Sequence, residues 1–136
     1  MRVTVIVPEA LMTAANHTHV ILGKSSDVHT YTAANWQDGQ GNLYAVSSGV
    51  WTDAQIAGVT NPAVLQGIVE AGEVPEAVDL TLVQQAQAAF SLVHMADDEG
   101  NTNAAPSLAG IVAIPSDNPH AALAWLGLTR IPEAIE

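Results

Sequence analysis

The sequence predicts an α+β fold, in which a small mixed or antiparallel sheet carries helices on one face. A β-branched-rich run at 2–7 and an apolar run at 108–114 have the composition of buried strands. Segments with apolar residues at helical spacing lie between the expected strands. The elements follow in the order strand, helix, strand, strand, helical insertion, helix, strand and short helix. Without the insertion this is the ferredoxin-like βαββαβ order, and residues 1–136 are expected to form a single domain.

The first half is predicted to form a strand, a helix and a hairpin. Pro8 follows the first strand where a helix can begin, and Gly23 supplies a left-handed stop. The buried face of this helix is expected to contain Leu11, Ala15, Thr18 and Leu22. The hairpin joins strands at 29–36 and 43–50 through the polar turn 37–42.

Residues 51–78 are predicted to be an acidic helical insertion or connector. Thr52 and Gln55 have the spacing of a capping box, and Asn61 before Pro62 is typical of a helix start. An apolar stripe follows at Val64, Leu65, Ile68 and Val69. Acidic residues then recur every three positions, which favours a solvated connector over a charged helix: Glu70, Glu73, Glu76 and Asp79.

The second half is predicted to contain a helix over about 81–95, capped by Asp79 or Thr81. Its apolar stripe is Leu82, Ala86, Phe90 and Val93. After an exposed loop at 96–106, the run 108–114 reads as a central strand buried on both faces. Asn118 and Pro119 then open a short helix that stops at Gly127.

The composition excludes several classes of function. The chain has 14 acidic and 3 basic residues, a net charge of −11, and 49% hydrophobic residues. Binding to nucleic acid or to an anionic membrane surface needs many more Lys or Arg side chains. The absence of cysteine excludes disulfides, thiolate catalysis and cysteine-ligated metals. The apolar run 3–7 is too short for a membrane span or for the core of a signal peptide.

No catalytic, cofactor-binding or metal-binding residue emerges from the motifs. His17 and His19 are two positions apart, which points them to different sides of a helix. The acidic stretch 97–101 lacks the alternating ligand spacing of a calcium loop. No catalytic serine motif and no apolar-flanked carboxylate pair occurs either. The sequence therefore predicts no enzyme, no metal and no cofactor.

Tryptophans supply the candidate contact residues. Trp36 and Trp51 flank the predicted hairpin, and if both were exposed they would form an anchor for a protein partner. Core packing is an equal or better interpretation for each of these residues and for Trp125.

Three segments carry a resemblance to a known group of proteins. They are the opening VTVIVPEALMTAANHTHVILG, the hairpin WQDGQGNLYAVSSG and the closing NPHAALAWLGLTRI. They resemble short acidic proteins encoded among the structural and tail genes of long-tailed bacteriophages and of gene-transfer-agent-like prophages of alphaproteobacteria. The resemblance implies a protein made in the host cytoplasm without a signal peptide and then incorporated into a virion. Its partners would be other virion or assembly proteins or further copies of itself.

The functional hypothesis is a non-enzymatic structural or assembly protein of a phage-like particle, acting through protein–protein contacts. The tail or its tip is the first expectation, and capsid decoration is the second. The alternative is a small ligand-binding or regulatory α+β domain, with a pocket along the sheet face or the helix 81–95. A third hypothesis is an acidic decoy for a DNA-binding protein, which requires the carboxylates of 70–79 and 97–99 to gather on one face.

Overall fold

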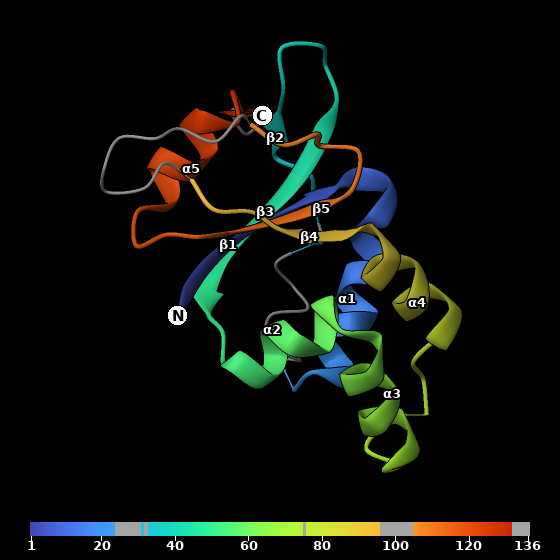
Figure 1. The fold of residues 1–136 in the computed structure, drawn as a ribbon. Coiled ribbons are helices and arrows are strands. Elements are labelled where there is room, and N and C mark those ends of the chain that lie inside the picture. Colours follow the sequence, from blue (N-terminus) through green and yellow to red (C-terminus); the bar gives the residue numbers. More distant parts are fainter. Residues whose placement is uncertain (24–30, 32, 75, 96–104, 132–136) are drawn as a thin grey trace.

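The computed structural model describes residues 1–23, 31, 33–74, 76–95 and 105–131, and the strands in these residues form a single six-stranded sheet (Figure 1). The strands are β1 Arg2–Pro8, β2 Trp36–Gln37, β3 Leu43–Val50, β4 Phe90–Leu92, β5 Ile111–Pro115 and β6 Thr129–Arg130. The helices are the 3-10 helix η1 Glu9–Leu11, then α1 Met12–Ile21, α2 Asp53–Thr60, α3 Pro62–Glu70, α4 Leu80–Ala89 and α5 Pro119–Trp125. The predicted α+β class is confirmed.

The sheet has the order β4-β5-β1-β3-β2-β6. Its inner strands β5, β1, β3 and β2 pair antiparallel, and β3 lies between the two strands that α1 connects. The chain order β1, α1, β2, β3, α4, β5 is therefore the predicted split βαββαβ arrangement. Two strands that the sequence did not indicate extend it. β4 pairs parallel with β5 at one edge, and β6 pairs antiparallel with β2 at the other.

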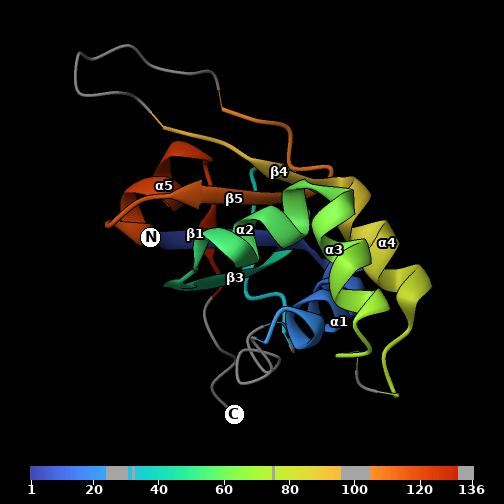
Figure 2. The same ribbon diagram turned by 60° about the horizontal axis from the view of Figure 1, so that its bottom comes forward.

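Alternating residues of the strands pack against two separate layers of helices. Val3, Val5 and Val7 of β1 face a core cluster shared with α1, α2 and α4. The side chain of Ile6 points the other way, into a cluster that includes Ala122 and Leu123 of α5. Figure 1 shows α5 on the opposite side of the strands from α1 to α4, and Figure 2 shows α1, α3 and α4 gathered together. Helices thus cover both faces, whereas the sequence predicted helices on one face only.

Local sequence signals set several helix boundaries. Gly23 and Gly127 adopt φ values of +77° and +73°, as expected for glycines that stop α1 and α5. The N-terminal caps of three helices accept hydrogen bonds from the first turn: Asn61 for α3, Asp79 for α4 and Asn118 for α5. Each of these boundaries agrees with a cap or stop that the sequence indicated.

The helical insertion between β3 and α4 is also confirmed. Thr52 and Gln55 form the reciprocal capping box at the start of α2. Leu65 of α3 packs with Ile21 of α1 and Val83 of α4 in a third apolar cluster. Val74 and Val78 pack against this cluster, while the carboxylates of 70–79 are exposed. The stretch after α3 is therefore a solvated connector that two valines attach to the core.

The helix predicted over 81–95 is too long. The helix α4 ends at Ala89, and Phe90 has φ −81° and ψ 132°. Residues Phe90–Leu92 then form β4 beside β5, with Phe90 opposite Ile111. Phe90 consequently packs against the cluster on one face of the sheet, and Val93 packs against the cluster on the other face. Backbone pairing with a distant strand has overridden a helical spacing pattern here.

The hairpin is shorter than predicted on its first strand. Its second strand, β3, spans the predicted 43–50. Its first strand contains only Trp36 and Gln37, opposite Tyr44 and Leu43. Residues 33–35 are not in a strand, and most of 29–32 lies outside the described residues. The predicted central strand 108–114 likewise begins later, at Ile111. Of the predicted loop 96–106, residues 96–104 lie outside the described residues.

A buried hydroxyl group on the α5 side of the sheet leads to a first prediction. Thr4 has no exposed surface, and its Oγ1 has no hydrogen-bond partner among the described residues. Thr4→Val removes this hydroxyl at nearly constant shape, so we expect the free energy of unfolding to rise by about 1 kcal/mol in urea titrations. The control is Thr18→Val, because Thr18 Oγ1 donates a 3.0 Å bond to the Ala14 carbonyl oxygen. An equal gain in both variants would contradict the explanation.

Candidate functional site

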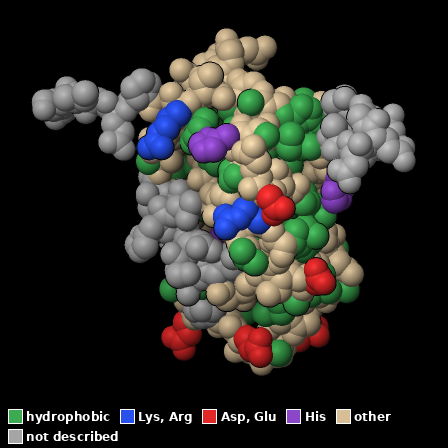
Figure 3. Space-filling model, turned by 90° about the vertical axis from the view of Figure 1, so that its left-hand side faces the viewer, with side chains coloured by type: hydrophobic (Ala, Val, Ile, Leu, Met, Phe, Trp, Pro, Cys, Tyr) green, Lys and Arg blue, Asp and Glu red, His purple; other side chains and the backbone are tan. Residues whose placement is uncertain are grey.

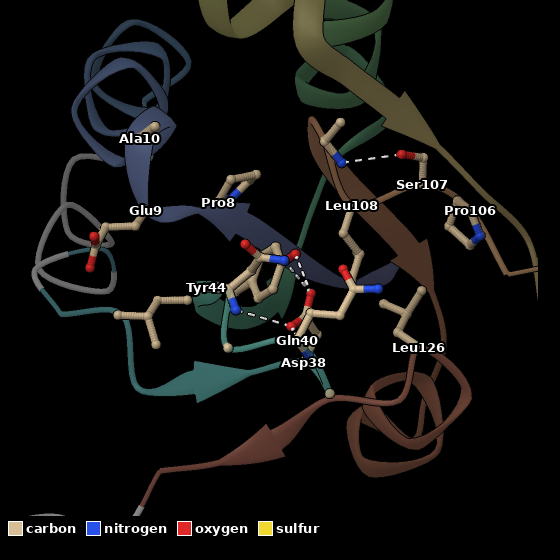
Figure 4. A pocket seen from close by; sticks show the side chains of 15 residues that line it. Pro8, Glu9, Ala10, Asp38, Gln40, Tyr44, Pro106, Ser107, Leu108 and Leu126 are labelled. Carbon is tan, nitrogen blue, oxygen red and sulfur yellow. Dashed lines mark hydrogen bonds between the residues drawn. The ribbon is translucent and has the colours of Figure 1, made fainter.

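A concave feature of the described residues lies at the end of the sheet where β1 finishes. It is an open hollow of about 1020 Å³. Three segments and one residue after α5 line it: 8–10, 38–44, 106–109 and Leu126. Figure 4 shows Glu9 on one side of the hollow and Leu108 and Leu126 on the other, with Asp38, Gln40 and Tyr44 between them. This hollow is the candidate functional site.

The β2–β3 turn is held together by a single carboxylate. Asp38 Oδ1 accepts hydrogen bonds from the backbone N–H groups of Gln40 and Asn42, at 2.8 and 3.0 Å. Its Oδ2 accepts from Asn42 Nδ2 at 2.9 Å and from the Tyr44 hydroxyl at 3.1 Å. An ionised carboxylate offers about four acceptor positions. Asp38 therefore uses its acceptor capacity to shape one wall of the hollow.

These hydrogen bonds change the acidity of both partners. They stabilise the charged form of Asp38, with the Asn42 side chain contributing most, and lower its pKa from 3.8 to about 2. Burial raises the pKa of Tyr44, and its hydrogen bond to Asp38 and the nearby negative charge act in the same direction. Asp38 thus remains ionised and Tyr44 remains neutral throughout the physiological pH range.

The depressed pKa of Asp38 predicts acid sensitivity of the turn. Because the folded pKa of about 2 lies below the ordinary value of 3.8, the stabilisation is complete above that value and is lost as pH falls through 2. We expect Asp38→Asn to lower the stability of the protein at neutral pH. We also expect this variant to lose less stability than the original protein as the pH falls from 3.8 to about 2. Carboxyl-carbon NMR titration of Asp38, with urea unfolding of both proteins at each pH, measures this. A midpoint near 3.8 would contradict it.

The lining of the hollow combines negative charge with apolar and neutral polar surface. Glu9 and Asp38 are its charged residues, and no Lys, Arg or His is among the described lining residues. Glu9 is exposed. The apolar lining comes from Pro8, Ala10, Leu43, Tyr44, Pro106, Leu108, Ala109 and Leu126. Such a surface can bind by shape, by apolar contact and by attraction of positive charge.

The candidate interface tryptophans do not lie together. The side chain of Trp51 is only 2% exposed and belongs to the core between the sheet and helices α1, α2 and α4. Trp36 is half-buried and packs on the cluster that contains α5, on the other face of the sheet, as does Trp125. The condition for a shared anchor, joint exposure of Trp36 and Trp51, is therefore not met.

The histidines of α1 have separate structural surroundings. His17 Nδ1 accepts a 2.9 Å hydrogen bond from the backbone N–H of Asp79, which links α1 to the start of α4. His19 is 3% exposed and makes edge-on ring contacts with Tyr31 and Trp51, with ring centroids 5.0 and 5.1 Å apart. Within the described parts of the chain, no three His, Cys, Asp or Glu side chains gather in a way that could hold a metal ion. The acidic stretch 97–101 lies outside those parts.

The hollow was not found from the sequence, although its turn was. The segment 37–42 was recognised as a turn, and it does connect β2 to β3. Its relation to 8–10 and 106–109 depends on β1 and β5 being neighbours in the sheet. A local signal that could have been used is Asp38 directly before Gly39. An aspartate at such a position commonly accepts hydrogen bonds from the backbone N–H groups of its own turn.

Comparison of the chain with protein-family models, with curated proteins and with solved structures returned no match. Among the helices of the described residues, none has both the length and the apolar character needed to cross a lipid bilayer.

Proposed function

We propose that this chain is a non-enzymatic structural or assembly protein of a phage-like particle, and that it acts through protein–protein contacts. The tail or its tip is the preferred location, and capsid decoration is the second. The observation that carries the proposal is the open hollow of about 1020 Å³, whose central carboxylate is committed to the fold of its own loop. Such a surface is suited to recognising a shape.

The layout of the core also supports the choice of the hollow as the contact surface. Apolar clusters fill the space between the sheet and the helices on both of its faces. The ligand-binding alternative first placed its pocket along the sheet face or the helix 81–95, and the cavity between β5, α1 and α4 has a volume of only about 10 Å³, room for about one water molecule. The segments that line the hollow offer a broad, open concave surface to a partner.

Quantitative mass spectrometry of purified particles tests the proposal. Particles from the source culture are separated from free protein on a density gradient, and the amount of this chain is measured relative to the major capsid protein. We expect the chain to co-purify with particles at a constant ratio. A low ratio indicates the tail tip, and a ratio near that of the capsid protein indicates decoration. If the chain occurs only in the free fraction, at every stage of particle assembly, the proposal fails.

A ligand-binding domain remains the alternative, and the volume of the hollow favours it. Small-molecule sites commonly have volumes of about 300–1,000 Å³, but they enclose most of the ligand. This hollow is open, so a small molecule would remain largely exposed there. A metabolite screen by thermal shift distinguishes the two functions, since a compound that raises the melting temperature and shifts the NMR signals of Gly39 and Gly41 would support the alternative.

The acidic-decoy hypothesis finds less support. It requires one continuous negative face. On the face shown in Figure 3, acidic side chains are spaced apart, with neutral and apolar surface between them and with basic side chains on the same face. Residues 97–99, which the hypothesis also uses, lie outside the described residues.

A further inference from the structure

We propose that the hollow at the end of β1 receives an extended, positively charged segment of a partner protein. This inference rests on the proposed function, and it specifies the chemistry of the partner.

The charge of the hollow has one sign. Its charged lining residues are Glu9 and Asp38, and the described residues place no Lys, Arg or His in its wall. Asp38 already accepts four hydrogen bonds from its own loop, so it acts on a partner as a fixed negative charge. Glu9 is exposed at the side of the hollow and can bind a cation directly. Both carboxylates favour an occupant that carries Lys or Arg.

The remaining lining suits an extended chain. Figure 4 shows Leu108 and Leu126 on one side of the hollow, Asp38 in its middle, and Glu9 at the opposite edge with its carboxylate turned outward. Successive side chains of an extended segment point in opposite directions. A segment that alternates apolar and basic residues can therefore contact Leu108 and Leu126 with one set and approach the carboxylates with the other.

Another copy of this chain does not have the composition that such an occupant needs, because the chain has only three basic residues, Arg2, Lys24 and Arg130. These residues are far apart in the sequence. None has a second basic residue within two positions, which an alternating basic segment requires. A different protein is therefore the partner that this charge pattern fits.

The test begins with selection from a random library of twelve-residue peptides displayed on messenger RNA, with the purified full chain as the target. We expect the selected peptides to be enriched in Lys and Arg and to alternate them with apolar residues. The tightest peptide is then synthesised, and its binding is mapped by amide NMR shifts. The shifts are expected at Gly39, Gln40, Gly41 and Ala109.

A matched pair of charge reversals separates specific binding from general attraction to an acidic protein. Glu9→Lys and Glu73→Lys change the net charge equally, and both positions are exposed, but Glu73 lies in the connector after α3. We expect Glu9→Lys to weaken the peptide's Kd about three- to tenfold, and Glu73→Lys to change it less than about twofold. Thermal unfolding of both variants verifies that they remain folded.

Several outcomes would overturn the inference. One is a selection that yields no binders, or binders without enrichment in Lys and Arg. Another is NMR shifts at the acidic connector instead of the hollow, or equal weakening by both charge reversals. If the chain co-purifies with particles while any of these results is obtained, the proposed function stands and only this inference fails. If the peptide results hold but the chain is never found in particles, the particle assignment fails alone.

Discussion

Replacing Trp51 with alanine is expected to lower the free energy of unfolding by about 3–5 kcal/mol, the usual range for a fully buried tryptophan. Its side chain is 2% exposed. The indole ring contacts the rings of His19 and Phe90, with centroids 5.1 and 6.4 Å away. Trp51 thereby joins α1 to β4, so truncation leaves a cavity between elements that are far apart in the sequence.

Trp36→Ala is the control for this substitution. Trp36 is half-buried in the two-residue strand β2, so we expect a loss of about 1–2 kcal/mol. Urea unfolding followed by far-UV circular dichroism measures both variants without using tryptophan fluorescence as the signal. Equal losses for the two variants would contradict the assignment of Trp51 to the core.

The fluorescence of the remaining tryptophan gives an independent check. In the double variant Trp36→Phe and Trp125→Phe, emission comes from Trp51 alone. A blue-shifted maximum is expected, because the ring is shielded from water. Emission typical of exposed indole would restore the original interface hypothesis for this residue.

Sequence reasoning succeeded where local chemistry decides the structure. The caps at Asn61, Asp79 and Asn118, and the stop at Gly127, each depend on residues within one helical turn. The buried strands β1 and β5 were recognised because their segments are rich in β-branched and apolar residues. These signals also placed the helical insertion correctly, since its capping box lies between recognisable neighbours.

The failures occurred where a distant segment decides the structure. Val83 and Ala86 are the buried residues of α4, and the stripe that suggested continuation through Phe90 has a spacing compatible with a helix. The neighbouring strand β5 gives Phe90 a pairing partner instead, and that partner is about 20 positions away in the sequence. The strand β6 contains only Thr129 and Arg130, too short a segment to carry a periodic signal.

The candidate site was beyond local reasoning for the same physical cause. The hollow exists because β5 pairs with β1 and β1 pairs with β3, which brings the ends of three segments together. The role of Asp38 was also missed, since an acidic residue in a turn commonly only interacts with solvent. Its contact with Tyr44 could be inferred only after the register of the hairpin was known.

Replacing Gly110 with alanine is expected to lower the free energy of unfolding by about 3 kcal/mol, at the upper end of the usual cost of overpacking. A Cβ atom at Gly110 would overlap the backbone carbonyl oxygen of Ala89. Backbone atoms cannot rotate away as a side chain can. The substitution therefore forces apart the end of α4 and the beginning of β5, where Phe90 pairs with Ile111.

Gly67→Ala is the matched control, because the same methyl group is added at a position where it meets no atom within 4 Å. Gly67 lies inside α3, where alanine has the higher helix propensity, so we expect stability to rise by about 0.5–1 kcal/mol. Urea titrations of the two variants should thus shift the midpoint in opposite directions. If Gly110→Ala were neutral, the close approach of α4 and β5 would be wrong. The position of β4 beside β5 at the sheet edge would then need to be revised, because β4 begins directly after Ala89, the residue that approaches Gly110.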